Sequence, residues 1–208
     1  REIIVAVKAG GPDPANNASL KDVIAKARSN NMPNDNINRT IKKAAGSGDG
    51  DNYESITYEG YGPAGVAVIV ETLTDNRNRT AADVRAAFSK YGGNMGQSGC
   101  VSFMFDRKGV IVIDEDKEID EDEITMDALE AGAEDISFDD GVIEITTDPD
   151  EVGNVREALE AKYTIASAEA SMIPQTTTDL TDEEQIKNMQ RLLEKLEDND
   201  DVQDVYHS

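Results

Sequence analysis

The chain has 208 residues, of which 38% are hydrophobic, and a formal net charge of −23 at pH 7. Its one cysteine, Cys100, excludes an internal disulfide and a cysteine-based zinc site, and its one histidine, His207, leaves almost no material for histidine-centred catalysis or metal binding. No apolar run approaches the about 20 residues of a membrane helix. We expect no signal or transit segment, and a cytoplasmic protein of about one to three domains.

The charge of this acidic protein is unevenly distributed. Residues 1–45 hold eight basic and four acidic side chains, a net charge of +4, whereas the rest of the chain carries −27. The acidic body repels a polyanion such as DNA or RNA, and only the basic head tolerates one. The chain also opens at Arg1 and not at Met, so we expect that preceding residues have been removed.

The head is predicted to be helical. Residues 1–9 are ambiguous between a strand, by their Ile and Val content, and a helix that stops at Gly10-Gly11-Pro12. A helix follows, because Ser19 with Asp22 resembles a capping box. Apolar residues then recur at helical spacing, at Leu20, Val23, Ile24 and Ala27.

A second helix is predicted from near Pro33 to Gly46, with its buried stripe at Ile37, Ile41, and Ala44 or Ala45. Two short helices bury too little apolar surface to form a core alone, so we expect an incomplete helical bundle at residues 1–50. The Gly- and Asp-rich stretch 46–52 is typical of a linker.

The next segment alternates strands with one helix. Strands are predicted at 53–59, 66–73 and 100–105, with a helix that Thr80 and Asp83 open and that buries Val84 and Phe88. A later unit reads as strand 110–113, helix 121–131, a hairpin turning at Asp139-Asp140-Gly141, helix 149–161 and the extended stretch 165–173. This β-α-β-β-α-β order is ferredoxin-like.

The tail adds a predicted helix at 182–196 and a strand at 202–206, which cannot form a domain alone. The economical solution is that they complete the earlier strand-helix-strand, so that both α/β units share one topology. The predicted fold class is therefore α+β, an incomplete N-terminal helical bundle followed by two ferredoxin-like α/β domains, one inserted in the other. The expected domains are 1–50, 51–107 with 172–208, and the inserted 108–171.

Seven basic residues are candidates for nucleic-acid binding: Lys26, Arg28, Arg39, Lys42, Lys43, Arg77 and Arg79. The first five form a basic stripe on two neighbouring helices of the head. The last two sit just before a predicted helix start, where two guanidinium groups and free backbone N–H groups suit a phosphate or a carboxylate. The competing interpretations are an ordinary solvated helix face for the stripe and ion pairs with nearby acids for the two arginines.

Two other segments invite a functional interpretation. The glycine-rich loop 92–99 could cradle phosphate, but it leaves a helix where a P-loop enters one and lacks the Gly-Lys-Ser/Thr ending, which favours a flexible connection. The acidic run 114–123 lacks the central glycine of a calcium loop and is typical of a solvated face. Because nucleophile, base and metal-ligand sets are all missing, we expect no enzyme, no cofactor and no small-molecule substrate.

Several segments together resemble a known family. They are NMPNDNI (31–37), YEGYGP (58–63), LTDNRNRT (73–80), FSKYGGN (88–94), AGAED (131–135), MIP (172–174) and DVQDVYH (201–207). In order along the whole chain, they closely resemble the YebC/PmpR family. The resemblance implies an N-terminal helical bundle and two α/β domains, one inserted in the other. It also implies about thirty preceding residues with a basic stretch that is absent here.

The family resemblance implies a cytoplasmic DNA-binding regulator of transcription as the leading hypothesis. The alternative is a ribosome-associated translation factor that contacts ribosomal RNA or tRNA, because a mitochondrial relative activates translation of cytochrome oxidase and some bacterial members act in translation on the ribosome. A weaker third possibility is a protein-interaction scaffold. No member of the family is an established enzyme, and none of the three readings involves a membrane.

Overall fold

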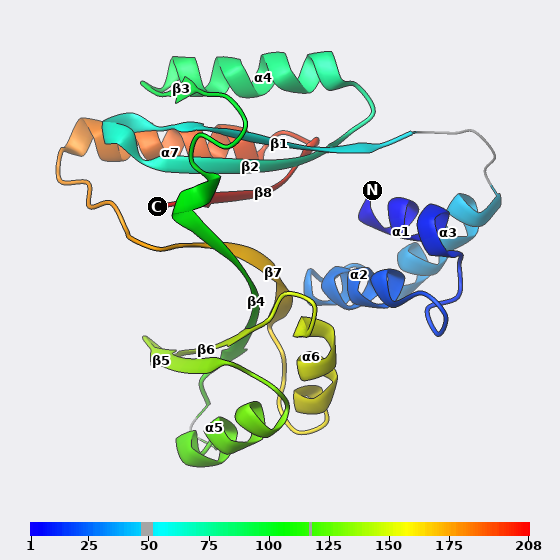
Figure 1. The fold of residues 1–208 in the computed structure, drawn as a ribbon. Helices are drawn as coiled ribbons and strands as arrows, with labels where there is room; N and C mark the ends of the chain where they lie inside the picture. The colour runs from blue at the N-terminus through cyan, green and yellow to red at the C-terminus, as the bar shows by residue number, and fades with distance from the viewer. Residues whose placement is uncertain (47–51, 117) are drawn as a thin grey trace. The chain divides into compact units, whose positions relative to one another are not determined.

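The computed structural model describes residues 1–46, 52–116 and 118–208 (Figure 1). The chain divides into two compact units. The first unit comprises Arg1, 49–106 and 172–208, and the second comprises 2–48 and 107–171. The three-domain division with its boundaries stays a prediction, and the predicted linker falls almost entirely outside the described residues. None of the described helices is long and apolar enough to cross a membrane.

The second unit begins with three helices, α1 (Glu2–Gly10), α2 (Ala18–Ser29) and α3 (Asn34–Gly46). The ambiguous first residues are therefore helical, and α1 packs against both α2 and α3. It supplies apolar surface that two helices alone could not provide. The core of this bundle consists of Ile3, Ala6, Val7, Leu20, Ile24, Ile37 and Ala44.

The start of α2 corrects the predicted capping box. Asn17, not Ser19, is the N-cap, and its Oδ1 accepts a hydrogen bond of 3.0 Å from the backbone N–H of Leu20. The side-chain amide of Asn17 also donates to the carbonyls of Ala6 and Gly11, each at 2.8 Å. Asn17 is chosen over Ser19 because one buried amide caps α2 and satisfies the end of α1 at the same time.

The remainder of the second unit is the predicted β-α-β-β-α-β succession. Its elements are β4 (Phe105–Asp114), α5 (Glu121–Glu130), β5 (Asp135–Asp139), β6 (Val142–Thr147), α6 (Val152–Glu160) and β7 (Ser167–Pro174). The sheet order β5-β6-β4-β7 places the first and third strands at the centre, as in ferredoxin-like folds. Asp140 and Gly141 both have positive φ, 47° and 76°, which confirms the predicted tight hairpin.

The first unit contains β1 (Glu54–Tyr61), β2 (Ala67–Thr74), α4 (Arg77–Lys90), β3 (Asn94–Met95), α7 (Glu183–Glu197) and β8 (Val202–His207). The sheet order is β3-β1-β2-β8, so the C-terminal strand pairs with β2 and the tail completes this sheet as predicted. The central strand β2 is buried on both faces. Val68 and Val70 join the core under α4 and α7, whereas Ala67 and Ile69 join a second cluster.

The predicted strand at 100–105 is wrong. Residues 98–101 form a turn, Ser102–Met104 is a 3-10 helix, and the strand begins only at Phe105, in β4 of the other sheet. In the sheet of the first unit, the strand between β3 and β2 is β1, which precedes β2 in the chain. When the strands of each sheet are numbered along the chain, the spatial orders are 3-1-2-4 in the first unit and 2-3-1-4 in the second. The two sheets therefore differ in topology, which corrects the expectation of a single one.

Within the described residues the fold is thus α+β, with N-terminal helices followed by two four-stranded sheets, each with two helices in its core. In the first unit these helices are α4 and α7, which bury Phe88 and Leu192. In the second unit they are α5 and α6, which bury Ile124 and Leu159. The fold class agrees with the prediction from sequence.

Candidate nucleic-acid interface

The α3 basic face consists of Arg39, Lys42 and Lys43. All three side chains are exposed, and Ile37 and Ala44 point to the core from the same helix. The spacing of three and four residues brings the three charges together on the solvent side. None of the three makes an ion pair or a hydrogen bond with another side chain in the described parts of the chain, so their charge is available to an external anion.

The two candidates on α2 lie in different surroundings. The Nζ of Lys26 is 3.2 Å from a carboxylate oxygen of Glu2 and 3.0 Å from one of Glu169, and its side chain is 28% exposed. Arg28 is exposed, and its Nε donates a 3.0 Å hydrogen bond to the side-chain oxygen of Asn34. Two carboxylates of the protein therefore neutralise the positive charge of Lys26. Among the described residues, no carboxylate pairs with Arg28.

The segment around Arg77 and Arg79 belongs to the first turn of α4. The helix begins three residues before the predicted start at Thr80, because Asn76 is the N-cap and its Oδ1 accepts a 3.1 Å hydrogen bond from the N–H of Arg79. The Oγ1 of Thr74 in turn accepts a 2.9 Å hydrogen bond from the N–H of Asn76. Both arginines therefore lie within the first turn of α4. The N-terminus of this helix is capped by the protein's own Asn76 side chain.

Arg79 is held by a buried carboxylate. Its Nη2 lies 3.0 and 2.9 Å from the two carboxylate oxygens of Asp201, which is 2% exposed, and 3.0 Å from Asp75. Thr80 donates a 2.8 Å hydrogen bond to the same carboxylate. Burial alone raises the pKa of Asp201, but hydrogen bonds from Arg1, Arg79 and Thr80 outweigh it and lower the pKa below its ordinary value.

Arg77 is different, because its side chain is 69% exposed and its Nε is 3.9 Å from Glu54. At that distance and exposure the ion pair is weak. The two neighbouring arginines thus have separate roles: Arg79 ties the start of α4 to the residue before β8, and Arg77 reaches into solvent. The competing interpretation, ion pairing with nearby acids, describes Arg79 well and Arg77 poorly.

Backbone N–H groups at the end of the glycine-rich loop donate hydrogen bonds to a buried carboxylate of the protein. The carboxylate of Glu59 accepts hydrogen bonds from the backbone N–H groups of Gly99 (2.5 Å), Val101 (3.2 Å) and Ser102 (2.6 Å). Burial raises the pKa of Glu59, yet these three hydrogen bonds lower it overall. The N–H groups that could cradle a phosphate are therefore occupied by a side chain of the protein, and this end of the loop is a hydrogen-bonded turn.

Sequence reasoning missed Glu59 and Asp201. Asp201 closes a run of acidic residues, and nothing in that run marks it as the buried member. Glu59 carries no such signal either, because alternation along a strand places it on the face opposite to the half-buried Tyr58. Both residues organise the first unit and neither contacts solvent substantially.

The acidic run has a structural role at one position. Asp120 caps α5 and accepts hydrogen bonds from the N–H groups of Asp122 (2.9 Å) and Glu123 (3.0 Å). In the ranges that the structure describes, no group of three or more His, Cys, Asp or Glu side chains is arranged to hold a metal ion. Among the described residues, the groups that remain as candidates for binding a ligand are therefore the exposed arginine and lysine side chains.

Comparison with known proteins assigns the whole chain to one family. Residues 1–47 match the model of the TACO1/YebC protein N-terminal domain, and residues 53–208 match the model of the TACO1/YebC second and third domain. A protein of Ruminiclostridium cellulolyticum named a probable transcriptional regulatory protein is 64% identical over all of this chain and 84% of its own length. A relative with the same name from Acetivibrio thermocellus is 58% identical over all of this chain and 86% of its own.

A solved structure shows the same fold. The crystal structure of a conserved hypothetical protein from Aquifex aeolicus superposes with a TM-score of 0.87 at 46% sequence identity, and the match covers 99% of this chain and 85% of that one. The fold is thus shared over 99% of this chain. This chain therefore belongs to the TACO1/YebC family.

Proposed function

We propose that this protein is a transcriptional regulator that binds DNA through the α3 basic face. The single observation that carries the proposal is that Arg39, Lys42 and Lys43 are exposed together and have no carboxylate partner among the described residues, in a chain with a net charge of −23. The relatives named probable transcriptional regulatory proteins support the regulatory role.

The charges around α3 favour this helix over other basic surfaces. The helix α3 carries one acid, Asp35, beside its three cations. The helix α7 also exposes three cations at helical spacing, Lys187, Arg191 and Lys195, but it carries four glutamates as well. Because a phosphate backbone is attracted by net local charge, α3 attracts it and α7 does not.

The remaining candidates divide by their partners. Arg28 and Arg77 are exposed and extend the proposed phosphate contacts. Lys26 and Arg79 are each paired with carboxylates, so we assign them to holding the fold together, with no main contribution to binding. Contacts of this kind fix affinity and position on the duplex, and they carry no sequence information by themselves.

The proposal also covers where and how the protein works. Its relatives are bacterial proteins named for transcription, and bacterial transcription takes place in the cytoplasm, where we place this chain. Binding through charged side chains requires neither a catalytic group nor a cofactor, so we propose a regulator and not an enzyme. The alternative of a ribosome-associated translation factor gains no support from the names of these relatives.

The test is the salt dependence of binding to duplex DNA, measured by fluorescence anisotropy. Each phosphate contact steepens the slope of log K against log salt by about 0.9, so three contacts weaken binding about 40-fold between 50 and 200 mM salt. The triple variant Arg39→Gln, Lys42→Gln, Lys43→Gln should bind more weakly and lose most of this slope.

A matched control is the triple variant Lys187→Gln, Arg191→Gln, Lys195→Gln, which removes the same charges from one exposed face of α7. We expect it to bind about as well as the unmodified protein, because α7 makes no contact with the DNA in this proposal. Equal losses in both variants would mean that only total charge matters. Binding that does not depend on salt, or no binding to DNA at all, would contradict the proposal.

A further inference from the structure

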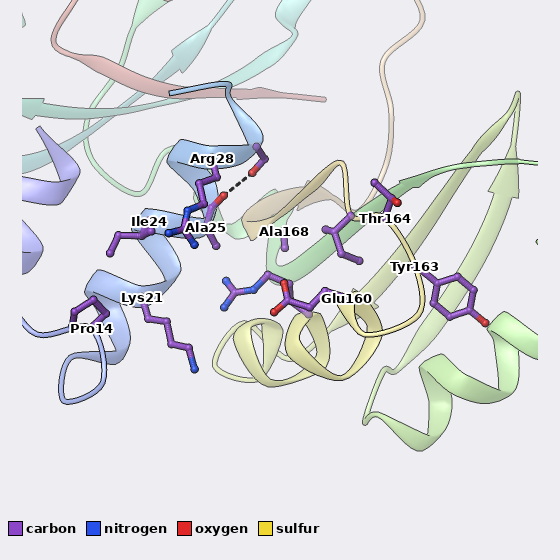
Figure 2. Close-up of a pocket in the computed structure, with 12 residues that line it drawn as sticks. Pro14, Lys21, Ile24, Ala25, Arg28, Glu160, Tyr163, Thr164 and Ala168 are labelled. Atoms are coloured by element: carbon purple, nitrogen blue, oxygen red, sulfur yellow. Dashed lines mark hydrogen bonds between the residues drawn. The ribbon is translucent and has the colours of Figure 1, made fainter. Parts of the chain in front are cut away.

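A cavity of about 650 Å³ opens in the second unit between α2 and the α6–β7 segment (Figure 2). Its volume lies within the range of about 300–1,000 Å³ that is usual for small-molecule sites. None of the three cations of the α3 basic face lines it. Of the residues assigned to DNA binding above, Arg28 lines this cavity, whereas the α3 basic face does not.

The charged lining of this cavity is mostly basic. Lys21, Arg28 and Arg156 line it, against the single carboxylate of Glu160. Figure 2 shows Lys21 and Arg28 on α2 and Glu160 across the cavity on α6. In a chain with 43 acidic and 20 basic residues, such a lining is the reverse of the average surface. Glu157 and Asp22 pair with Lys21 and Arg156, so Arg28 is the lining cation without a carboxylate partner among the described residues. Its charge makes an anionic ligand a better match than a cationic one.

Arg156 is a buried charge with incomplete hydrogen bonding. Its side chain is 6% exposed, its Nη1 donates to Asp22 at 3.1 Å, and its Nη2 is 3.8 Å from Glu157. Its Nε is buried and has no hydrogen-bond partner among the described residues. A buried donor of this kind is normally satisfied, so the guanidinium of Arg156 has hydrogen-bonding capacity that the described fold does not use.

The two walls of the cavity are fastened to each other. Lys21 forms an ion pair with Glu157, Arg156 forms one with Asp22, and a Cβ at Gly153 would come within 2.8 Å of the Asp22 carboxylate. The glycine thus allows α6 to approach α2 closely at this edge. These contacts and the close approach at Gly153 place α6 against α2 at this edge of the cavity.

We propose that this cavity binds a small phosphate ester of about nucleotide size. The guanidinium groups of Arg28 and Arg156 meet the phosphate, because a planar fork of donors matches phosphate oxygens. The uncharged part of the ligand lies against the apolar side of the lining, which includes Ile24 and Ile165. In a DNA-binding regulator, such a site would take an effector, and the site stands whether or not the α3 basic face binds DNA.

The test is isothermal titration calorimetry of the full chain with three probes: adenosine monophosphate, inorganic phosphate and adenosine. We expect the monophosphate to bind most tightly, phosphate weakly, and adenosine least. Arg28→Gln should weaken binding of the monophosphate about tenfold or more, since it removes a charge-assisted contact. Arg191→Gln, an exposed arginine on α7, is the matched control and should bind as the unmodified protein does.

A second variant guards against misfolding. Arg156→Lys keeps the buried charge but loses the planar fork, and circular dichroism reports whether it folds. We expect a folded protein with weakened binding of the monophosphate. The triple variant of the α3 basic face should bind the monophosphate normally, which separates failure of this inference from failure of the proposed function.

Three results would overturn the inference. One is the absence of any heat of binding with the monophosphate at millimolar concentration. Another is binding that Arg28→Gln and Arg156→Lys leave unchanged. The third is binding of an oligonucleotide that depends on Arg28 without binding of the mononucleotide, because the lining cations would then belong to the nucleic-acid surface.

Discussion

The carboxylate of Glu59 offers a sharp test of how the first unit is held together. It is 5% exposed and accepts three backbone hydrogen bonds from the turn that follows β3. In Glu59→Gln the side-chain oxygen can still accept, but the amide nitrogen faces the N–H of Gly99 as donor against donor. An unsatisfied buried donor costs about 1–3 kcal/mol, and loss of the charge adds to this, so we expect about 2–4 kcal/mol of destabilisation at pH 7.

The pH dependence of this effect has a defined sign. Because the folded state lowers the pKa of Glu59, its charge stabilises the fold fully above the pKa of the unfolded chain, and this stability is lost as the pH falls through the folded-state pKa. The difference in unfolding free energy between the unmodified protein and Glu59→Gln should therefore be largest near neutral pH and shrink in acid.

The assay is urea unfolding followed by far-ultraviolet circular dichroism at several pH values. Glu54→Gln is the matched control, since Glu54 lies on the same strand with an exposed side chain and, among the described residues, makes only the weak contact to Arg77. It should change stability by less than about 0.5 kcal/mol. The reasoning fails if Glu59→Gln is as stable as Glu54→Gln, or if its destabilisation is the same at acid and neutral pH.

Two further predictions concern the same unit. Gly60→Ala would place a Cβ 2.6 Å from the backbone oxygen of Asn94, so we expect about 1–3 kcal/mol of destabilisation by urea unfolding, whereas Gly46→Ala, with open space around it, should be near neutral. Asp201→Asn keeps the shape but weakens the hold on Arg79 and Thr80, so amide hydrogen exchange should quicken at the start of α4 and in β8. Unchanged exchange there would contradict the role given to Asp201.

What the sequence predicts well is local. The hairpin at Asp139-Asp140-Gly141 follows from residues that tolerate positive φ, and the buried face of α4 follows from the spacing of Val84 and Phe88. The sheet completed by the C-terminal tail was predictable as well, because a lone helix and strand need a partner sheet. Each of these depends on neighbouring residues or on a simple requirement for burial.

What the sequence does not predict depends on partners far along the chain. The strand expected at 100–105 does not form because Glu59, about 40 residues earlier, takes the N–H groups of that segment. Arg79 looks like a phosphate ligand until Asp201 is placed beside it. The cap of α2 is Asn17 because the end of α1 needs the same amide. No local pattern encodes these contacts.

The site is predicted in outline only. The exposed stripe Arg39, Lys42 and Lys43 follows from helical spacing, and its place on the solvent side of α3 agrees with that prediction. Which neighbouring cations remain available does not follow from spacing. Lys26 and Arg28 are two residues apart on one helix, yet carboxylates surround only the first.

The central claim is that the α3 basic face binds DNA in the cell. The most direct measurement is crosslinking of the full-length protein in cells, with sequencing of both the bound DNA and the bound RNA, compared with the triple variant of Arg39, Lys42 and Lys43. We expect enrichment of DNA at discrete sites that disappears in the variant. Enrichment of ribosomal RNA or tRNA without DNA, or DNA enrichment that the variant retains, would contradict it.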